Sequence, residues 1–229
     1  MRALLLAAGY GIRLRPLTDT IPKCLVPIKG RPLLEIWMER LREAGIGPFL
    51  INTHYLAEQV EAFIGSSIFK DQVTLIQEKE LLGTAGTLIK NLDFFQGKEG
   101  LLIHADNYCL ADFNDFMQAH LNRPQECVMT MMTFRTDAPR NCGIVEIDSR
   151  GVVFDFHEKV ESPPGNLANG AVYILSKELL KRLRIDFHSV TDFSNQVLHQ
   201  LVGYIYTFET KNIFLDVGTP EAYAKANLC

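Results

Sequence analysis

The chain has 229 residues, of which 47% are hydrophobic and 22% are charged, and its formal net charge is −4. This composition is typical of a globular protein, and no apolar run reaches the roughly 18 residues that a membrane span needs. A negative charge without a long basic run argues against nucleic acid as a partner, and it predicts that individual cations serve a small anionic ligand.

The start of the chain and its cysteines bear on the compartment. Arg2 precedes a short apolar run and then glycines and arginines, whereas a signal peptide would end in a small-residue cleavage site. The five cysteines show no C-x-x-C spacing, so neither a disulfide framework nor a zinc site is indicated. We therefore expect a cytoplasmic protein with no membrane partner, and the sequence leaves a homodimer open.

Short apolar runs alternate with helical patterns in the first half of the chain. Residues 3–8 form a continuous apolar run, as in strands that are buried on both faces of a sheet. Residues 31–41 have helical spacing and a proline where a first turn tolerates one. A further helix is expected at residues 56–64, and further strands at residues 49–52, 73–76 and 101–104. This alternation predicts a parallel sheet covered by helices.

The pattern changes after about residue 125, where strands follow one another with turns between them. Strands are expected at residues 128–134, 143–147, 152–157, 171–175, 204–207 and 213–215, and helices at residues 194–201 and from Pro220. We therefore predict an α/β fold, with a Rossmann-like, mostly parallel sheet flanked by helices and a smaller α+β portion. Since no linker or repeat divides the chain, residues 1–229 are expected to form one domain, with portions at roughly 1–125 and 126–229.

The first apolar run leads into a loop that is suited to bind phosphate. Gly9 and Gly11 can take positive φ and bring backbone N–H groups close to an anion, while Arg13 and Lys23 supply positive charge. A Rossmann fingerprint needs a third glycine where Leu14 stands and an immediate helix, which the following prolines disfavour. A Walker A loop needs Gly-Lys-Ser/Thr, which is absent. The alternative is an ordinary turn with surface cations.

Two carboxylates end apolar strands that are distant in sequence. Asp106 follows residues 101–104 and Asp216 follows residues 213–215, and in open α/β sheets ligands sit outside the carboxyl ends of the strands. Taken alone, Asp106 is also compatible with a helix N-cap. No histidine is adjacent to either carboxylate, which argues against zinc and leaves hard oxygen ligands of the kind that Mg²⁺ prefers.

These motifs together resemble those of the sugar-1-phosphate nucleotidyltransferases. That family has roughly L-A-A-G-x-G-[ST]-R-L-x-P-L-T followed by P-K-x-L-x-P, and residues 6–18 and 22–27 match except that Ile12 replaces the hydroxyl residue. The family's metal motifs match at residues 105–107, where Ala105 replaces a glycine, and at residues 216–220. Segments around residues 77–86, 141–145, 158–159 and 166–173 also match, with Val160 in place of a proline. The resemblance covers essentially the whole chain.

The resemblance implies a role for each matching residue. It implies that Arg13 and Lys23 are catalytic and that Asp106 and Asp216 bind Mg²⁺. Nucleotide contacts are implied for Leu6, Ala8, Gly9, Gly11, Gln77, Gly83 and Thr84. Sugar-phosphate contacts are implied for Asn107, Gly143, Glu158, Lys159 and Asn169. Read without the resemblance, residues 83–86 are a capped helix after a turn, and the last segments are a strand, a charged pair and a loop.

The activity that the resemblance implies is transfer of a nucleotidyl group from an NTP to a sugar 1-phosphate, with release of pyrophosphate. Residues 1–125 would hold the nucleotide and residues 126–229 the sugar phosphate. Short family members include mannose- and heptose-1-phosphate guanylyltransferases and N-acetylmuramate-1-phosphate uridylyltransferases, and we favour GTP with a manno-type sugar. A non-catalytic nucleotide- or sugar-phosphate-binding subunit of the same fold stays open. A nicotinamide oxidoreductase would need the missing third glycine.

Overall fold

The computed structural model describes all residues from 1 to 229, and they group into two compact units. Unit 1 comprises Met1–Leu81, Ile103–Ala111 and Asn212–Cys229, and unit 2 comprises Leu82–Leu102 and Asp112–Lys211. Each unit therefore draws on segments that are distant in sequence. No helix combines the length and the apolar character that crossing a membrane requires.

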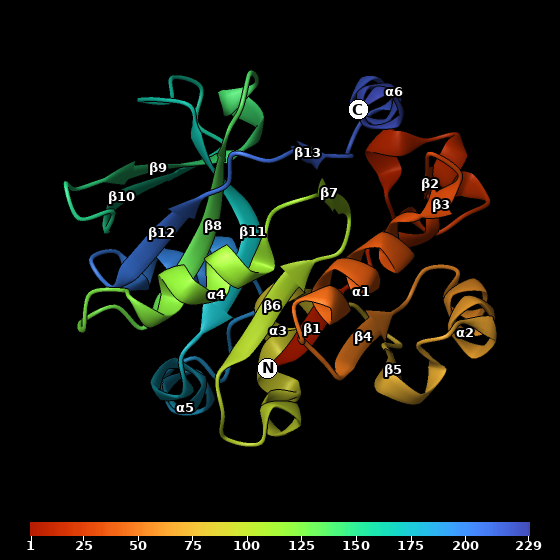
Figure 1. Ribbon diagram of the computed structural model, residues 1–229, viewed down its shortest axis with the longest axis horizontal. Coiled ribbons are helices and arrows are strands. Elements are labelled where there is room, and N and C mark those ends of the chain that lie inside the picture. Colours follow the sequence, from red (N-terminus) through yellow and green to blue (C-terminus); the bar gives the residue numbers. More distant parts are fainter. The chain divides into compact units, whose positions relative to one another are not determined.

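Unit 1 is built on three parallel strands. β1 (Arg2–Leu6) pairs with β4 (Phe49–Thr53), and β4 pairs with β5 (Val73–Gln77), in the arrangement drawn in Figure 1. Parallel neighbours need crossover connections, and these contain α1 (Leu33–Glu43) and α2 (Ala57–Ser66). The strands and helices predicted for this region are confirmed.

Helix α1 forms because its apolar residues recur at helical spacing and are buried on one face, among them Leu34, Trp37 and Leu41. It begins two residues later than predicted, because Arg31–Pro32 first form the short strand β3, which pairs with β2 (Pro27–Ile28). Helix α1 therefore starts directly after Pro32, where the extended backbone of β3 ends.

A second, two-stranded sheet joins distant parts of unit 1. β7 (Asn107–Cys109) pairs antiparallel with β13 (Phe214–Asp216), and Asn107 lies opposite Asp216. Figure 1 shows β13 beside β7, followed by α6 (Pro220–Leu228). Strand β7 was not predicted, since three residues after a turn give no periodic signal. Its pairing brings the two sequence-distant carboxylate motifs together.

The strands of unit 2 are mainly antiparallel. β8 (Met129–Arg135) pairs antiparallel with β11 (Leu167–Leu175) and parallel with β12 (Ile205–Glu209). β9 (Gly143–Ile147) pairs antiparallel with β10 (Val153–Glu158) and with β11. The strand β6 (Gly100–His104) crosses the boundary between the units in sequence. The antiparallel strands predicted for the second half of the chain are confirmed.

Two expectations for unit 2 are wrong in detail. Read alone, the segment at residues 166–171 indicated a loop, but β11 begins at Leu167, because Ala168 pairs with strands on both sides and a bulge follows Asn169. The helix expected at residues 194–201 is a π-helical turn, Phe193–Val197, followed by a 3₁₀ turn, Leu198–Leu201. The Gln196 side chain accepts hydrogen bonds from the backbone N–H groups of Thr191 and Asp192, which directly precede this turn.

Three α-helices complete unit 2: α3 (Gly83–Lys90), α4 (Phe113–Leu121) and α5 (Lys177–Asp186). The last two were not predicted, although both have N-cap signals in the sequence. Asp112 accepts a hydrogen bond from the N–H of Asn114 at 2.8 Å, and Ser176 accepts one from the N–H of Leu179 at 3.1 Å.

Candidate active site

The loop after β1 is a series of tight turns, and no α-helix begins before α1, as the prolines predicted. Gly11 has a φ of 64°, and a Cβ built on it would lie 2.9 Å from Cγ2 of Thr18. Both its backbone conformation and its surroundings therefore require glycine. The Thr18 hydroxyl donates a hydrogen bond to the carbonyl of Gly11 at 2.8 Å and fixes the loop from the other side.

A buried polar chain holds the start of this loop to the sheet. The N–H of Ala7 donates to Oδ1 of Asn52 at 2.8 Å, and Nδ2 of Asn52 donates to Oε1 of Glu78 at 3.0 Å. Asn52 and Glu78 are both buried, so these hydrogen bonds are shielded from water. Neither residue was predicted, although a polar side chain at the end of an apolar strand is a signal for Asn52.

Four charged side chains of unit 1 converge beside this loop. Nζ of Lys23 lies 2.8 Å from Oδ2 of Asp106 and 3.7 Å from Oδ1 of Asp216. Nη2 of Arg13 lies 3.5 Å from Oδ2 of Asp216, although the two residues are 203 positions apart. The structure therefore brings both predicted catalytic cations together with both predicted metal ligands.

Lys23 controls the charge of this cluster. Partial removal from water would raise the pKa of Asp106, but the ammonium of Lys23, together with His104 and a backbone hydrogen bond, outweighs this effect and lowers the pKa to about 2. Asp106 is therefore ionised at neutral pH. It lies in the turn between β6 and β7, with no helix after it, so the alternative reading as a helix N-cap is wrong.

The chemistry of the donor set fits a divalent cation. The carboxylates of Asp106 and Asp216 both point at one positive group, the ammonium of Lys23. Hard oxygen ligands converging on one point are what Mg²⁺ requires from protein. The carbonyl of Asn107, next to Asp106, accepts a hydrogen bond from the indole of Trp37 at 2.7 Å, so that α1 fixes this strand end.

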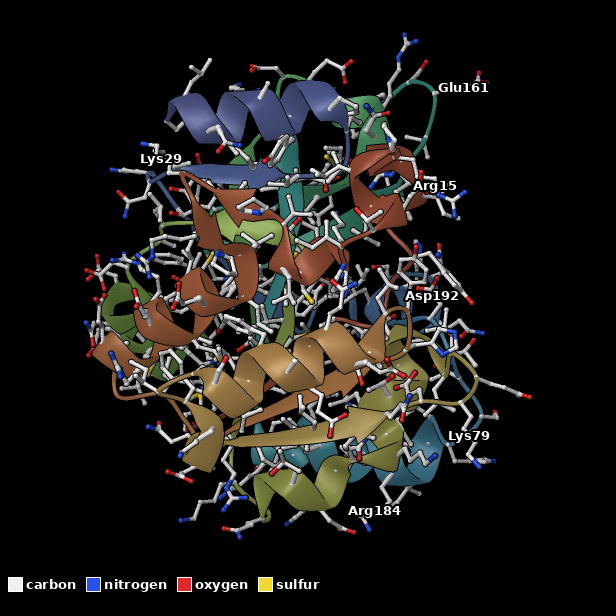
Figure 2. All side chains as sticks on the ribbon, turned by 90° about the vertical axis from the view of Figure 1, so that its right-hand side faces the viewer. Arg15, Lys29, Lys79, Glu161, Arg184 and Asp192 are labelled. Carbon is white, nitrogen blue, oxygen red and sulfur yellow. The ribbon has the colours of Figure 1, made fainter.

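Arg15 does not join the cluster, because it pairs with a different acidic residue. Its Nε lies 3.0 Å from Oδ1 of Asp19, and in Figure 2 the labelled side chain projects outward from the molecule. Arg13 instead rests against Gly218, where a Cβ would lie only 2.6 Å from Nη2 of the arginine. The two arginines, two positions apart in sequence, thus have different environments, and only Arg13 joins the carboxylates.

Unit 2 gathers most of the residues predicted to contact the sugar phosphate. Gly143 lies opposite Glu158 across β9 and β10, and a Cβ on it would lie 2.5 Å from Oε2 of Glu158. Oε1 of Glu158 lies 3.2 Å from Nζ of Lys159, whose own φ is 51°. The absence of a side chain at position 143 therefore leaves room for the carboxylate of Glu158, which is only slightly exposed.

Asn169, a predicted sugar contact, also forms hydrogen bonds with neighbouring residues of unit 2. Its Nδ2 donates to the hydroxyl of Tyr173 at 2.7 Å, and its Oδ1 accepts from the N–H of Ala171 at 2.8 Å. Ala171 has a φ of 54°, so this hydrogen bond supports a backbone conformation that alanine rarely adopts. Tyr173 is fully buried and was not predicted as part of the site.

The second glycine segment opens α3. Gly83 has a φ of 77°, and a Cβ on it would lie 2.3 Å from the carbonyl oxygen of Thr191. That oxygen accepts a hydrogen bond from the N–H of Ala85 at 2.9 Å, and Oγ1 of Thr84 accepts one from the N–H of Phe193 at 2.8 Å. The segment around Thr191 thus shapes this turn. Gln77, in unit 1, ends β5 with an exposed side chain.

Comparison with known proteins identifies the family of this chain. The model of the nucleotidyl transferase family matches residues 2–229. The chain belongs to this family.

Two relatives and one solved structure are among the most similar. The chain is 30% identical over 228 residues to the mannose-1-phosphate guanylyltransferase catalytic subunit beta of Drosophila melanogaster, with 97% of the chain covered but only 60% of the relative's length. It is 28% identical to the D-glycero-alpha-D-manno-heptose 1-phosphate guanylyltransferase of Campylobacter jejuni, with 97% of both covered. The crystal structure of HddC from Yersinia pseudotuberculosis with GMP-PN superimposes with a TM-score of 0.83 at 29% identity, covering 99% of this chain and 98% of that one. The predicted family and α/β fold class are confirmed.

Proposed function

We propose that this protein transfers a nucleotidyl group from an NTP to a sugar 1-phosphate, giving a nucleoside-diphosphate sugar and pyrophosphate. The observation that carries the proposal is the cluster in unit 1, where Lys23, Arg13, Asp106 and Asp216 converge beside a glycine loop. Phosphoryl-type transfer needs positioning and neutralisation of charge more than covalent help, and this cluster consists of charges.

Each charged residue has a role in this reaction. A phosphate oxygen of the sugar phosphate attacks the α-phosphorus of the NTP, and the bond to the pyrophosphate oxygen breaks. Arg13 stabilises the charge that develops on the departing pyrophosphate, and Lys23 stabilises the charge at the transferred phosphate. Asp106 and Asp216 would hold Mg²⁺, which when bound would neutralise the triphosphate charge. Lys159 in unit 2 meets the phosphate of the sugar phosphate.

The remaining assignments divide between base, phosphate and sugar. We assign the backbone of Leu6, Ala8, Gly9 and Gly11 to the nucleotide phosphates, and Gln77, Gly83 and Thr84 to the base. Asn107, Gly143, Glu158 and Asn169 are assigned to the sugar phosphate. The exposed position of Gln77 and the backbone turn at Gly83 support these assignments. The division of one domain near residue 125, the cytoplasmic location and the homodimer stay predictions.

GTP and a manno-type sugar 1-phosphate are the favoured substrates. The relatives named above are guanylyltransferases of mannose 1-phosphate and of a manno-heptose 1-phosphate, which supports this choice. The purified chain should therefore be tested with each of the four NTPs against a panel of sugar 1-phosphates, with pyrophosphate release as the readout. The highest rate is expected for GTP with a manno-configured sugar.

The alternative, a non-catalytic binding subunit, gives a different outcome in the same matrix. Such a protein would bind NTP or sugar phosphate by calorimetry and release no pyrophosphate with any pair. The presence of all four charged residues in one cluster supports the catalytic reading, since a binding subunit has no need for both carboxylates.

A further inference from the structure

Lys23 occupies the place between the two carboxylates that a metal ion would take. Its ammonium lies 2.8 Å from Asp106 and 3.7 Å from Asp216, and its side chain is only 8% exposed. From this geometry we infer that Lys23 is an internal counter-ion that competes with Mg²⁺, so that metal binding releases Lys23 from the carboxylates and makes it available to the phosphates. The inference rests on the metal role proposed above for Asp106 and Asp216.

Electrostatics favours an exchange of this kind. Asp106 and Asp216 are two acidic groups brought together by the pairing of β7 with β13, and Lys23 is the cation that lies near both of them. An ammonium and a divalent ion compete for these carboxylates, because both are drawn to the space between them and the two cations repel each other. Binding the divalent ion there therefore weakens the attraction that holds Lys23 and favours its release.

The backbone of Lys23 is held in place, so any movement of this residue is a movement of its side chain. Lys23 begins a 3₁₀ turn, Lys23–Leu25, whose residues are buried, and the carbonyl of Lys23 accepts a hydrogen bond from the N–H of Val26 at 3.2 Å. The four-carbon stem is the flexible part of the residue.

The released ammonium has a destination beside it. A Cβ built on Gly11 would lie 3.1 Å from Cβ of Lys23, so the stem of the lysine starts next to the glycine loop. An anion held by that loop is the next available partner for the charge. Metal loading and delivery of Lys23 to the phosphates are therefore coupled, and without metal the lysine stays bound to Asp106.

Direct metal binding tests this exchange without any turnover. Mn²⁺ is titrated into the full chain, and free Mn²⁺ is followed by electron paramagnetic resonance, for wild type and for Lys23→Met, Arg13→Met and Lys70→Met. Lys70 is an exposed lysine that begins the turn before β5, so its replacement removes the same charge elsewhere in unit 1. Arg13→Met removes a charge that borders Asp216 without lying between the carboxylates.

We expect Lys23→Met to bind Mn²⁺ at least about tenfold more tightly than wild type, since a competing charge-assisted hydrogen bond is gone. Arg13→Met should show a clearly smaller gain, and Lys70→Met none. Equal or weaker binding by Lys23→Met overturns the inference, as does a gain in Arg13→Met of the same size. It is also overturned if Mn²⁺ binds normally to Asp106→Asn or Asp216→Asn, because the metal then lies elsewhere.

A measurement on wild type covers the case in which Lys23→Met fails to fold. The rate at which acetic anhydride labels Lys23 is followed by mass spectrometry with and without Mg²⁺, relative to Lys70. Saturating Mg²⁺ should raise the relative rate several-fold, whereas an unchanged or lower rate contradicts the exchange. A chain that behaves as described but releases no pyrophosphate with any substrate pair would lose the proposed function and keep this inference.

Discussion

Gly218 lies directly against the guanidinium of Arg13, so that a Cβ at position 218 would stand 2.6 Å from Nη2 and 2.9 Å from Oδ1 of Asp216. Because Gly218 has no side chain, the guanidinium of Arg13 can lie in this position. Because Asp216 is two residues away on the same turn, a side chain at position 218 would disturb a proposed metal ligand and a proposed catalytic cation together.

Gly218→Ala should lower kcat/KM for nucleotidyl transfer by about tenfold or more, since loss of one preorganised charge-stabilising group costs about 3 kcal/mol and the alanine displaces Arg13 without removing it. The matched control is Gly65→Ala in α2, where a Cβ meets no atom within 4 Å. That variant should keep full activity. If both variants retained wild-type kcat/KM, Arg13 would not need its observed position.

Arg13 and Arg15 should differ sharply on truncation. Arg13 faces Asp216, whereas Arg15 faces Asp19 four residues further along its own loop. Arg13→Ala should cost about 3 kcal/mol of transition-state stabilisation, or about 100-fold in kcat/KM. Arg15→Ala should cost well under 1 kcal/mol, as is typical for an exposed pair. Steady-state kinetics on the two variants decide the matter, and equal losses would show that the loop motif is misassigned.

Asn169→Ala should separate the use of the sugar phosphate from nucleotide binding. The variant removes the proposed sugar contact, so kcat/KM for the sugar phosphate should fall and the preference among epimers should flatten. NTP affinity measured by calorimetry should be nearly unchanged. It should also lower the free energy of unfolding by about 1–3 kcal/mol, because the buried hydroxyl of Tyr173 loses one hydrogen-bond partner and the N–H of Ala171 loses the side chain that supports it.

Tyr173→Phe is the control for the loss of stability that Asn169→Ala is expected to cause. It removes one end of the hydrogen bond to Asn169 and leaves the amide in place. We expect a comparable loss of stability with a smaller loss of sugar-phosphate use. A parallel fall of NTP affinity in Asn169→Ala would contradict the assignment of this residue to the sugar phosphate.

His120 should make unit 2 less stable in mild acid. Burial, with a smaller contribution from Arg123, lowers the pKa of His120 to about 3, and its Nδ1 lies 2.7 Å from the hydroxyl of Thr130. The unfolded chain takes up a proton near pH 6.5 and the folded chain does not, so stability is fully present above pH 6.5 and falls as pH drops towards 3. Urea unfolding should lose about 1 kcal/mol per pH unit below pH 6 from this group. His120→Gln should show a shallower slope, and an identical slope would contradict the assignment.

Much of the fold could be predicted because its elements carry local periodic signals. The runs that became β1, β4 and β5 are apolar throughout, and α1 repeats its apolar residues at helical spacing. Strand β7 could not be predicted, because its pairing with the distant strand β13 determines it. At Phe193–Val197 the apolar pattern indicated a helix but does not distinguish a π-helical turn from an α-helix. The helices α4 and α5 have caps at Asp112 and Ser176 that could have indicated them.

The candidate site divides in a similar way. Motif spacing identified the residues whose type the chemistry dictates, such as Lys23, Asp106 and Asp216, and the structure brings these three together. It could not identify residues that act through a neighbour. Asn52 holds the loop through the N–H of Ala7, and Trp37 fixes the strand end through the carbonyl of Asn107. Such roles depend on contacts between segments that are distant in sequence.

The most direct test of the proposed function follows the phosphorus atoms of GTP through one turnover. The protein is incubated with Mg²⁺, a manno-configured sugar 1-phosphate and GTP labelled either at the α- or at the γ-phosphate. The account predicts that the α-label appears in a nucleoside-diphosphate sugar and the γ-label in pyrophosphate, in equal amounts. Label from the γ-position in the sugar product, or α-label recovered only as GTP or GMP, would contradict it.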